Sequence, residues 1–290
     1  MVKEIYVKSI LNKHRKRDEW FLDDYSLNPY KLCQFNCIYC YIRGSKYGES
    51  MDKELAVKIN APTLLEKELF KRAKRKEYGF IALSSSIEPW QPVEEKYRIT
   101  RSCLEVISKF RFPVHCLTKS ELILRDLDLF EEIDKKAVLP PDLRAISRGV
   151  LITFSLSTLD EQIARIFEPG APKPKKRLET LQKVKEAGFC AGIAYIPVLP
   201  FISDSEEQLE EMVKTARELN ADYVFVGALT LHGEGKKLYF KVIERHFPEL
   251  LSEYKKLFKA YNQPSRNYQR KLEEKAKRLC EMHRVKYRIT

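Results

Sequence analysis

Residues 33–40 read CQFNCIYC, with cysteines at positions 33, 37 and 40. Cys33, Cys37 and Cys40 are therefore separated by three residues and then by two. Such short spacings bring several thiols to one metal centre. The segment holds no fourth cysteine, so a centre bound here keeps one coordination site without a protein sulfur.

The composition of the 290 residues is ordinary for a globular protein, with 44% hydrophobic and 32% charged residues. This length fits one large α/β domain followed by a tail. The N-terminus lacks the apolar core of a signal peptide, and no apolar run approaches the roughly 20 residues of a membrane span. Seven cysteines, three of them bunched, indicate metal binding in a reducing compartment rather than disulfides. We therefore expect a cytoplasmic protein that does not bind a membrane.

The positive charge of the chain is concentrated near its C-terminus. The net charge is +12, and residues 235–290 hold 16 Lys and Arg against 6 Asp and Glu. The same segment interleaves aromatic residues with cations, as in YKKLFKAY at residues 254–261. Stacking rings beside cations are typical of sites for single-stranded nucleic acid. Alternatively, the rings of one helical face pack on the core and the lysines form its solvated side.

Strand-like apolar runs alternate with segments of helical period, which is the pattern of successive βα units around a parallel sheet. The expected strands are residues 25–32, 79–85, 113–118, 150–157, 189–196 and 221–228. The expected helices are residues 63–75, 94–109, 121–135, 178–187, 205–219, 249–261 and 268–283. Six units are too few to close an eight-stranded barrel, so we expect an α/β fold with a partial (β/α)6 barrel.

We expect two parts in the chain: a barrel domain over residues 1–234 and a basic, helical extension over residues 235–290 that packs on or beside it. Ligands of such folds gather at the carboxyl ends of the strands. The cysteine loop follows the first expected strand and so belongs to this active face. The stretch VLPPDLRAISRG, residues 138–149, lengthens the link between the third helix and the fourth strand.

The pattern C-x3-C-x-aromatic-C, with Tyr39 as the aromatic residue, resembles the signature of radical S-adenosylmethionine (SAM) enzymes. The chain is most similar to their spore photoproduct lyase branch, over residues 8–231. The stretches that carry the resemblance are NPYKLCQFNCIYCYIRG, SSSIEPWQPVEEKYRITR, LTKSELILRDLDL, SLSTLD, FEPGAPKPKKRLETLQKVKEAG and YIPVLPFISD. It implies that Cys33, Cys37 and Cys40 bind three irons of a [4Fe-4S] cluster, whose fourth iron binds the methionine end of SAM. Reductive cleavage of SAM then gives methionine and a 5′-deoxyadenosyl radical that abstracts hydrogen from a substrate.

The resemblance also implies which positions bind SAM. Acceptors for its ammonium would come from the second strand, a cation for its carboxylate from the third, hydroxyls for its ribose from the fourth, and apolar contacts for its adenine from the fifth. In that order, the residues are Ser84, Ser85, Ser86 and Glu88; Lys119; Ser155 and Ser157; and Ile196 and Val198. Each also has an ordinary explanation: serines end strands, lysines are solvated, and a glutamate caps a helix.

The catalytic residue is not identified by the resemblance. Spore photoproduct lyase returns a hydrogen atom to its product from a cysteine near the second-strand motif, and FIALSSSIEPW at residues 80–90 contains no thiol. Cys116 on the third strand is a substitute candidate, although a cysteine on an apolar strand is usually a small buried hydrophobe.

Three functions remain open. The first is a radical SAM enzyme that acts on nucleic acid bound through residues 235–290, with an external electron donor such as ferredoxin or flavodoxin. The second is the same chemistry on a protein or a small metabolite. The third is a nucleic-acid-binding module with a structural metal, for example zinc held by the three cysteines and a distant histidine.

Overall fold

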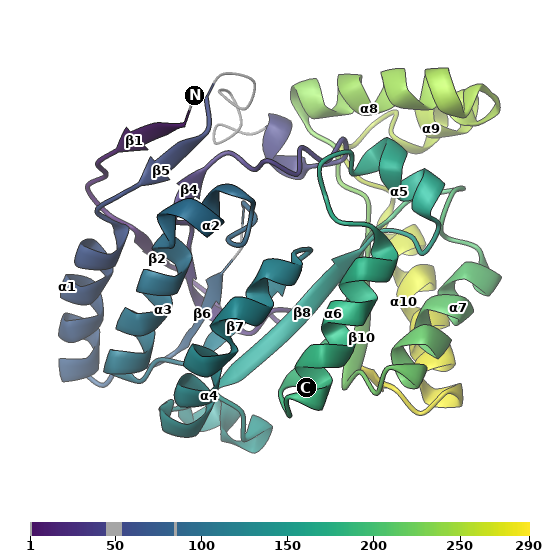
Figure 1. Cartoon of the computed structure of the whole chain (residues 1–290). Helices are drawn as coiled ribbons and strands as arrows, with labels where there is room; N and C mark the ends of the chain where they lie inside the picture. Colours follow the sequence, from purple (N-terminus) through teal and green to yellow (C-terminus); the bar gives the residue numbers. More distant parts are fainter. Residues whose placement is uncertain (1, 45–53, 84–85) are drawn as a thin grey trace.

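The computed structural model describes residues 2–44, 54–83 and 86–290 (Figure 1). Its main sheet has the strand order β11-β10-β9-β8-β7-β6-β3-β2. The strand bounds are β2 Leu11–Lys13, β3 Asp23–Leu27, β6 Phe80–Leu83, β7 Val114–Thr118, β8 Val150–Leu156, β9 Cys190–Val198, β10 Tyr223–Ala228 and β11 Lys286–Tyr287. β2 runs antiparallel to β3, and the other neighbouring strands of this sheet are parallel. A small second sheet joins β1 Lys3–Ile5, β5 Ala56–Lys58 and β4 Tyr30–Lys31.

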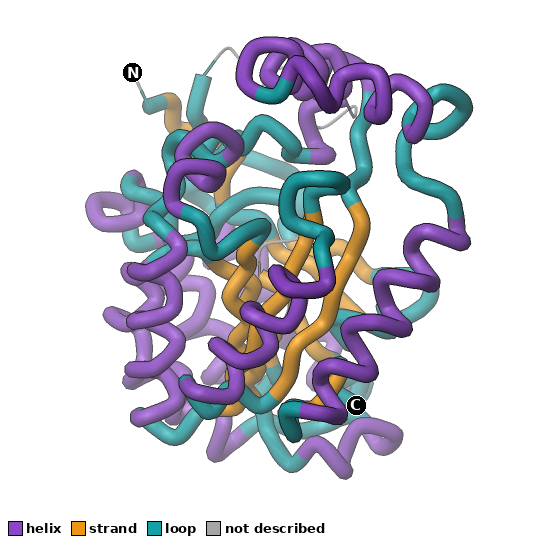
Figure 2. The backbone as a smooth tube through the Cα atoms, turned by 90° about the vertical axis from the view of Figure 1, so that its right-hand side faces the viewer, coloured by secondary structure: helices purple, strands orange, loops and turns teal. Residues whose placement is uncertain are grey.

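Helices surround the strands of the main sheet (Figure 2). The α-helices are α1 Ala61–Lys74, α2 Val93–Tyr97, α3 Ile99–Phe110, α4 Leu127–Lys136, α5 Glu161–Phe167, α6 Pro174–Glu186, α7 Glu206–Glu218, α8 Gly233–His246, α9 Leu251–Leu257 and α10 Arg266–Met282. Short 3-10 helices are η1 Tyr41–Gly44, η2 Glu121–Asp126, η3 Pro141–Ile146 and η4 Pro248–Leu250. None of the helices in the described part of the chain is long and apolar enough to cross a membrane.

The six expected βα strands correspond to the parallel strands β3 and β6 to β10, so the predicted partial barrel is confirmed. The central strands are buried on both faces; all seven residues of β8, VLITFSL, are buried. Strands that are buried on both faces are near-continuous apolar runs, which explains why the sequence pattern predicted them.

The helices differ more from expectation. The helix predicted over residues 94–109 is divided into α2 and α3, because Arg98 has a left-handed backbone conformation, with φ of 52°. The helix predicted over residues 121–135 begins as the 3-10 helix η2, and the one over residues 249–261 is reduced to η4 and α9. Helices α5 and α8 were missed. α5 has only seven residues, and α8 begins GEG, which is unfavourable for a helix.

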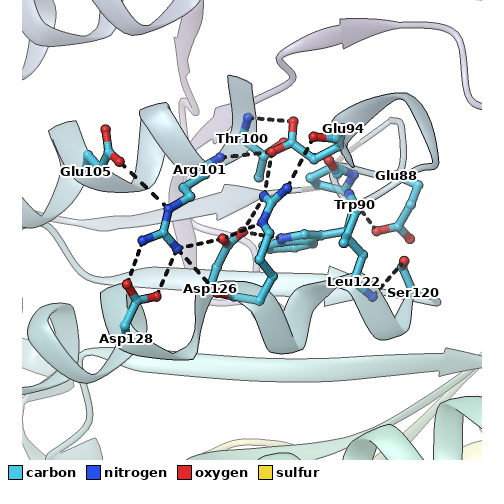
Figure 3. A network of polar contacts seen from close by, with 12 residues as sticks. Glu88, Trp90, Glu94, Thr100, Arg101, Glu105, Ser120, Leu122, Asp126 and Asp128 are labelled. Carbon is cyan, nitrogen blue, oxygen red and sulfur yellow. Dashed lines mark hydrogen bonds and ion pairs between the residues drawn. The ribbon is translucent and has the colours of Figure 1, made fainter. Parts of the chain in front are cut away.

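A buried ion network holds the bend between α2 and α3 (Figure 3). Glu94 of α2 is fully buried and accepts a hydrogen bond of 2.7 Å from Arg125. Asp126, also fully buried, accepts bonds of 3.0 Å from Arg101 and 2.9 Å from the indole of Trp90. Buried charges are tolerated when they are paired. The network therefore fixes both helices, η2 and the segment that precedes α2.

The C-terminal helices contact the barrel in two places. Leu272, Ala276 and Leu279 of α10 belong to the same core as the central strands. α8 and α9 lie next to α5 at the carboxyl ends of the strands (Figure 1), where Tyr254 and Phe258 are buried in a separate cluster. The core-packing explanation is therefore correct for these two rings, which are not available to stack on bases. The division of the chain at residue 234 stays a prediction.

The inserted stretch 138–149 lies at the amino ends of the strands. Its 3-10 helix η3 places Leu143 in a cluster with Phe80, Leu151 and Tyr223. This stretch therefore closes the base of the barrel, away from the cysteine loop.

A buried histidine connects the strands inside the barrel. His115 of β7 is 1% exposed; its Nδ1 lies 2.7 Å from the carbonyl oxygen of Phe21 and its Nε2 lies 2.6 Å from Oγ1 of Thr153. The Thr153 hydroxyl lies 2.7 Å from that of Tyr223. Burial lowers the pKa of His115 to about 4, because an imidazolium loses its hydration there.

We expect His115 to make the protein less stable as the pH falls. The unfolded chain protonates this ring near pH 6.5, whereas the folded chain does so only near pH 4. The stability that the neutral ring contributes is thus present above pH 6.5 and is lost as the pH falls towards 4, by about 2 kcal/mol between pH 7 and pH 5. Urea denaturation of the wild type and His115→Gln at both pH values measures this loss. Equal pH dependence in the two proteins would contradict it.

Candidate active site

A cavity of about 320 Å³ lies beside the cysteine loop, at the carboxyl ends of the central strands. We call it the cysteine cavity. Eight of the predicted site residues line it: Cys33, Cys37, Cys40, Ser86, Glu88, Lys119, Ser155 and Ile196. Ser84 and Ser85 lie outside the described residues. The structure thus brings together residues from five separate stretches of sequence.

The cysteine loop docks on the end of α5 and on the segment that follows it. The backbone N–H of Ile38 donates a hydrogen bond of 2.8 Å to the carbonyl of Phe167, and the N–H of Gly170 donates one of 3.1 Å to the carbonyl of Phe35. A Cβ at Gly170 would lie 2.4 Å from the carbonyl oxygen of Gln34. Only glycine allows this approach, so Gly170 helps to set the position of the cysteine loop.

The three cysteines of the loop are free and partly buried. Burial raises the pKa of Cys33 to about 11 and that of Cys37 to about 12, and it also raises the pKa of Cys40. Thiols in such surroundings become thiolates when a metal replaces the proton. Among the described residues, no three His, Cys, Asp or Glu side chains converge closely enough to hold a single metal ion.

A buried carboxylate lies beneath the loop. Glu168 is 2% exposed and accepts hydrogen bonds from the hydroxyl of Tyr39 and from the guanidinium of Arg177. Ser157 donates a third bond of 3.1 Å to it. Burial opposes ionisation, but Arg177, Lys119 and the Tyr39 hydroxyl together outweigh this effect and hold the pKa of Glu168 below its usual value. The contacts fix Tyr39, and with it the loop, against the end of β8.

Lys119 and Glu88 form one wall of the cavity. Glu88 is 5% exposed and accepts 2.7 Å and 2.9 Å hydrogen bonds from the hydroxyl of Thr118 and the backbone N–H of Lys119. Burial raises the pKa of Glu88. The Lys119 ammonium donates a 2.8 Å bond to Ser155 and lies 5.9 Å from the centre of the Tyr39 ring. An ammonium has three donors, and the bond to Ser155 uses one of them.

Three predicted residues of the described chain do not line this cavity. Ser157 is fully buried and bonds to Glu168, and Val198 is fully buried in the main core. Cys116 also belongs to that core, on the opposite face of β7 from His115, because successive side chains of a strand alternate between faces. Burial raises the pKa of Cys116 well above its ordinary value. This position does not support a catalytic role for its thiol.

A larger chamber of about 1020 Å³ adjoins the cysteine cavity. We call it the lateral chamber. The two spaces share five lining residues: Tyr41, Leu117, Ile196, Ala228 and Thr230. Other parts of its wall come from residues 14–23 and from residues 263–269. The sequence analysis missed these residues, although a charged Asp23 at the start of a buried strand was a visible signal.

The model of the radical SAM superfamily matches residues 27–216, which is more than half of the chain. The chain therefore belongs to the radical SAM superfamily and is an enzyme of that type, rather than a binding module with a structural metal. An uncharacterized protein of Mycobacterium bovis is 29% identical over 269 residues, covering 90% of this chain and 75% of that protein. An uncharacterized protein of Methanocaldococcus jannaschii is 28% identical over 186 residues, covering 63% of each chain.

Within the superfamily, the fold is of the spore photoproduct lyase kind, as the resemblance predicted. A solved structure of a spore photoproduct lyase variant covers the whole chain with a TM-score of 0.73 at 16% identity, over 82% of its own length. A variant with bound AdoMet and dinucleoside spore photoproduct gives 0.70 at 17% identity, covering 100% of this chain and 81% of that one. Streptococcus suis SuiB bound to the precursor peptide SuiA gives 0.51 at 16% identity, covering 82% and 47%.

We expect Glu168→Ala to destabilise the protein strongly, because it leaves the buried guanidinium of Arg177 without its carboxylate. The loss is about 3 kcal/mol or more of the free energy of unfolding, measured by urea denaturation. Glu161→Ala is the matched control, since Glu161 of α5 pairs with the exposed Lys173 at 2.8 Å. That change costs less than about 1 kcal/mol. Similar losses of unfolding free energy in both variants would show that the ion pair of Glu168 with Arg177 is not the source of the effect.

Proposed function

We propose that this enzyme holds a [4Fe-4S] cluster on Cys33, Cys37 and Cys40 and binds SAM in the cysteine cavity. The single observation that carries the proposal is that the three thiols and Lys119 line one cavity. In a cluster each thiolate binds a different iron, so the sulfurs need not converge on one point. Structural zinc needs a closed tetrahedral set of four ligands. The loop supplies three cysteines, one fewer than such a set needs, which favours the cluster over zinc.

Lys119 is the residue we assign to the carboxylate of SAM, because a fixed cation offsets an anion that leaves water. Its bond to Ser155 keeps the ammonium at the wall of the cavity. The other assignments are Ser84, Ser85, Ser86 and Glu88 for the amino group, Ser155 for the ribose and Ile196 for the adenine. Ser157 and Val198 would act indirectly, through Glu168 and through packing.

The cluster, when bound, supplies the electron that cleaves SAM and so generates the radical that removes hydrogen from the substrate. The residues of the chain orient SAM and exclude water: Leu117, Ile196 and Leu229 supply apolar parts of the wall. We further propose an external electron donor such as ferredoxin or flavodoxin, and a cytoplasmic location, where such donors and reduced thiols occur.

Anaerobic reconstitution with iron and sulfide tests the proposal. We expect the wild type to become brown and to form methionine and 5′-deoxyadenosine from SAM and dithionite. The Cys37→Ala variant should neither become brown nor form these products. Lys119→Met keeps the cluster but binds SAM at least about tenfold more weakly, because a charge-assisted contact is lost. The shift of the reduced cluster's electron paramagnetic resonance signal on SAM addition measures this affinity.

Lys175→Met is the control for the loss of one lysine, since Lys175 is exposed on α6. It should bind SAM as the wild type does. Tight zinc binding with no SAM cleavage in the wild type would overturn the proposal.

We propose nucleic acid as the substrate class. The cations of residues 235–290 support it, and so does the dinucleoside ligand of the spore photoproduct lyase structure. Exposed cations occur on α9, after it, and at the start of α10, as Lys255, Lys259 and Arg266 show. Arg266 also lines the lateral chamber. A protein or a small metabolite is the alternative substrate, and SuiB bound to its precursor peptide has a related fold.

Replacing Lys255, Lys259 and Arg266 with Glu should weaken binding of a single-stranded DNA twelve-mer at least about tenfold and reduce the slope of log affinity against log salt by about 2. Fluorescence anisotropy at several salt concentrations measures both. Truncation at residue 235 is unsuitable, because α10 fills part of the core. The control replaces the exposed Lys67, Lys71 and Lys74 of α1 with Glu. Equal losses of DNA affinity in both triple variants would remove the support for the C-terminal segment as the nucleic-acid-binding surface.

A further inference from the structure

Asp23 carries an unsatisfied acceptor in the wall of the lateral chamber. It begins β3 and is 4% exposed. Its Oδ2 lies 3.2 Å from Nδ1 of His14. Its Oδ1 is buried and has no hydrogen-bond partner among the described residues. A buried carboxylate oxygen without a donor is unfavourable, so a ligand that offers a donor here is favoured.

Several other charges on this side of the chamber already have partners. Arg17 pairs with Asp24 at 3.0 Å and also with Asp142. The carboxylate of Asp18 accepts bonds of 2.8 Å from the backbone N–H groups of Trp20 and Phe21. In contrast, no residue in the described part of the chain donates to the Oδ1 atom of Asp23.

The chamber has the size and the walls for a planar ring. Its volume of about 1020 Å³ is at the upper end of the usual range for small-molecule sites. The aromatic residues Trp20, Phe21 and Tyr41 are among those that line it. Aromatic walls of this kind accept the face of a nucleobase. Tyr41 also lines the cysteine cavity, so a ring held here lies next to the proposed SAM site.

We propose that Asp23 is a specificity-determining residue that accepts a hydrogen bond from an N–H donor of a nucleobase, supplied by a single strand whose base enters the lateral chamber. The inference rests on the proposed nucleic-acid substrate. Asp23 is among the lining residues of the chamber, so its carboxylate belongs to the wall that an entering base meets. A ligand without an N–H donor leaves the oxygen unsatisfied and binds at least about tenfold more weakly.

The test uses single-stranded DNA twelve-mers in which one base, A, C, G or T, stands among abasic residues, together with a fully abasic strand. Fluorescence anisotropy at pH 8 gives the affinity of the full-length wild type, Asp23→Asn and the control Glu131→Gln. Glu131 pairs with Lys135 on the exposed face of α4. In the wild type, at least one base should raise the affinity about tenfold over the abasic strand. Asp23→Asn should lose most of that gain and bind the abasic strand normally. Glu131→Gln should keep it.

A second measurement needs no variant. Methylation of the donor nitrogen of the preferred base should abolish the gain in the wild type, because the ring remains but the N–H is lost. A gain that survives either the methylation or Asp23→Asn would overturn the inference, as would equal affinity for all strands. Failure of the wild type to bind the abasic strand would instead reject nucleic acid as the substrate class. Failure to cleave SAM in the reconstitution would reject the radical chemistry.

Discussion

Glu168 accepts hydrogen bonds from Tyr39 in the cysteine loop, from Arg177 in α6 and from Ser157 at the end of β8. These partners come from three separate stretches of the chain, and both charged groups are almost completely buried. A buried ion is strongly unfavourable until its partners are in place. The loop, the helix and the strand must therefore assemble together. The position of the cysteines is a consequence of this assembly, because Tyr39 lies between two of them.

The two cations near the loop have different surroundings. Arg177 is fully buried, and two more of its N–H groups donate to the carbonyls of Pro172 at 2.8 Å and Ser155 at 3.1 Å. Lys119 lines the cavity beside the thiols. The planar guanidinium of Arg177 presents several donors in fixed directions, which suits a buried structural position. The ammonium of Lys119 is carried by a flexible side chain, which suits a ligand that binds and dissociates. Arg177 thus stabilises the loop and leaves Lys119 available for an anionic group.

The sequence predicted the six barrel strands, because doubly buried parallel strands are continuous apolar runs. It also predicted the cysteine loop, whose spacing is local. It did not reveal the contact of Tyr39 with Glu168, which spans 129 residues, or the pairing of Asp23 with His14 across the β2–β3 turn. Such contacts depend on how elements pack, not on a pattern within a short window. The bend at Arg98 was missed for a similar reason, since buried Glu94 and its partners stabilise it.

The buried rings of the C-terminal segment change how a nucleic acid would bind. Tyr254 and Phe258 pack with Tyr239, and Tyr239 stacks on Phe167 at 5.2 Å between ring centres, beside the cysteine loop. These aromatics therefore support the loop, and only the exposed cations of the segment would be left for the phosphates of the proposed substrate. Phosphate contacts give affinity without selectivity, whereas contacts with base edges distinguish one base from another. For the proposed nucleic-acid substrate, the two requirements would be met in different places: charge on the outer helices would attract the strand, and the lateral chamber would select the base.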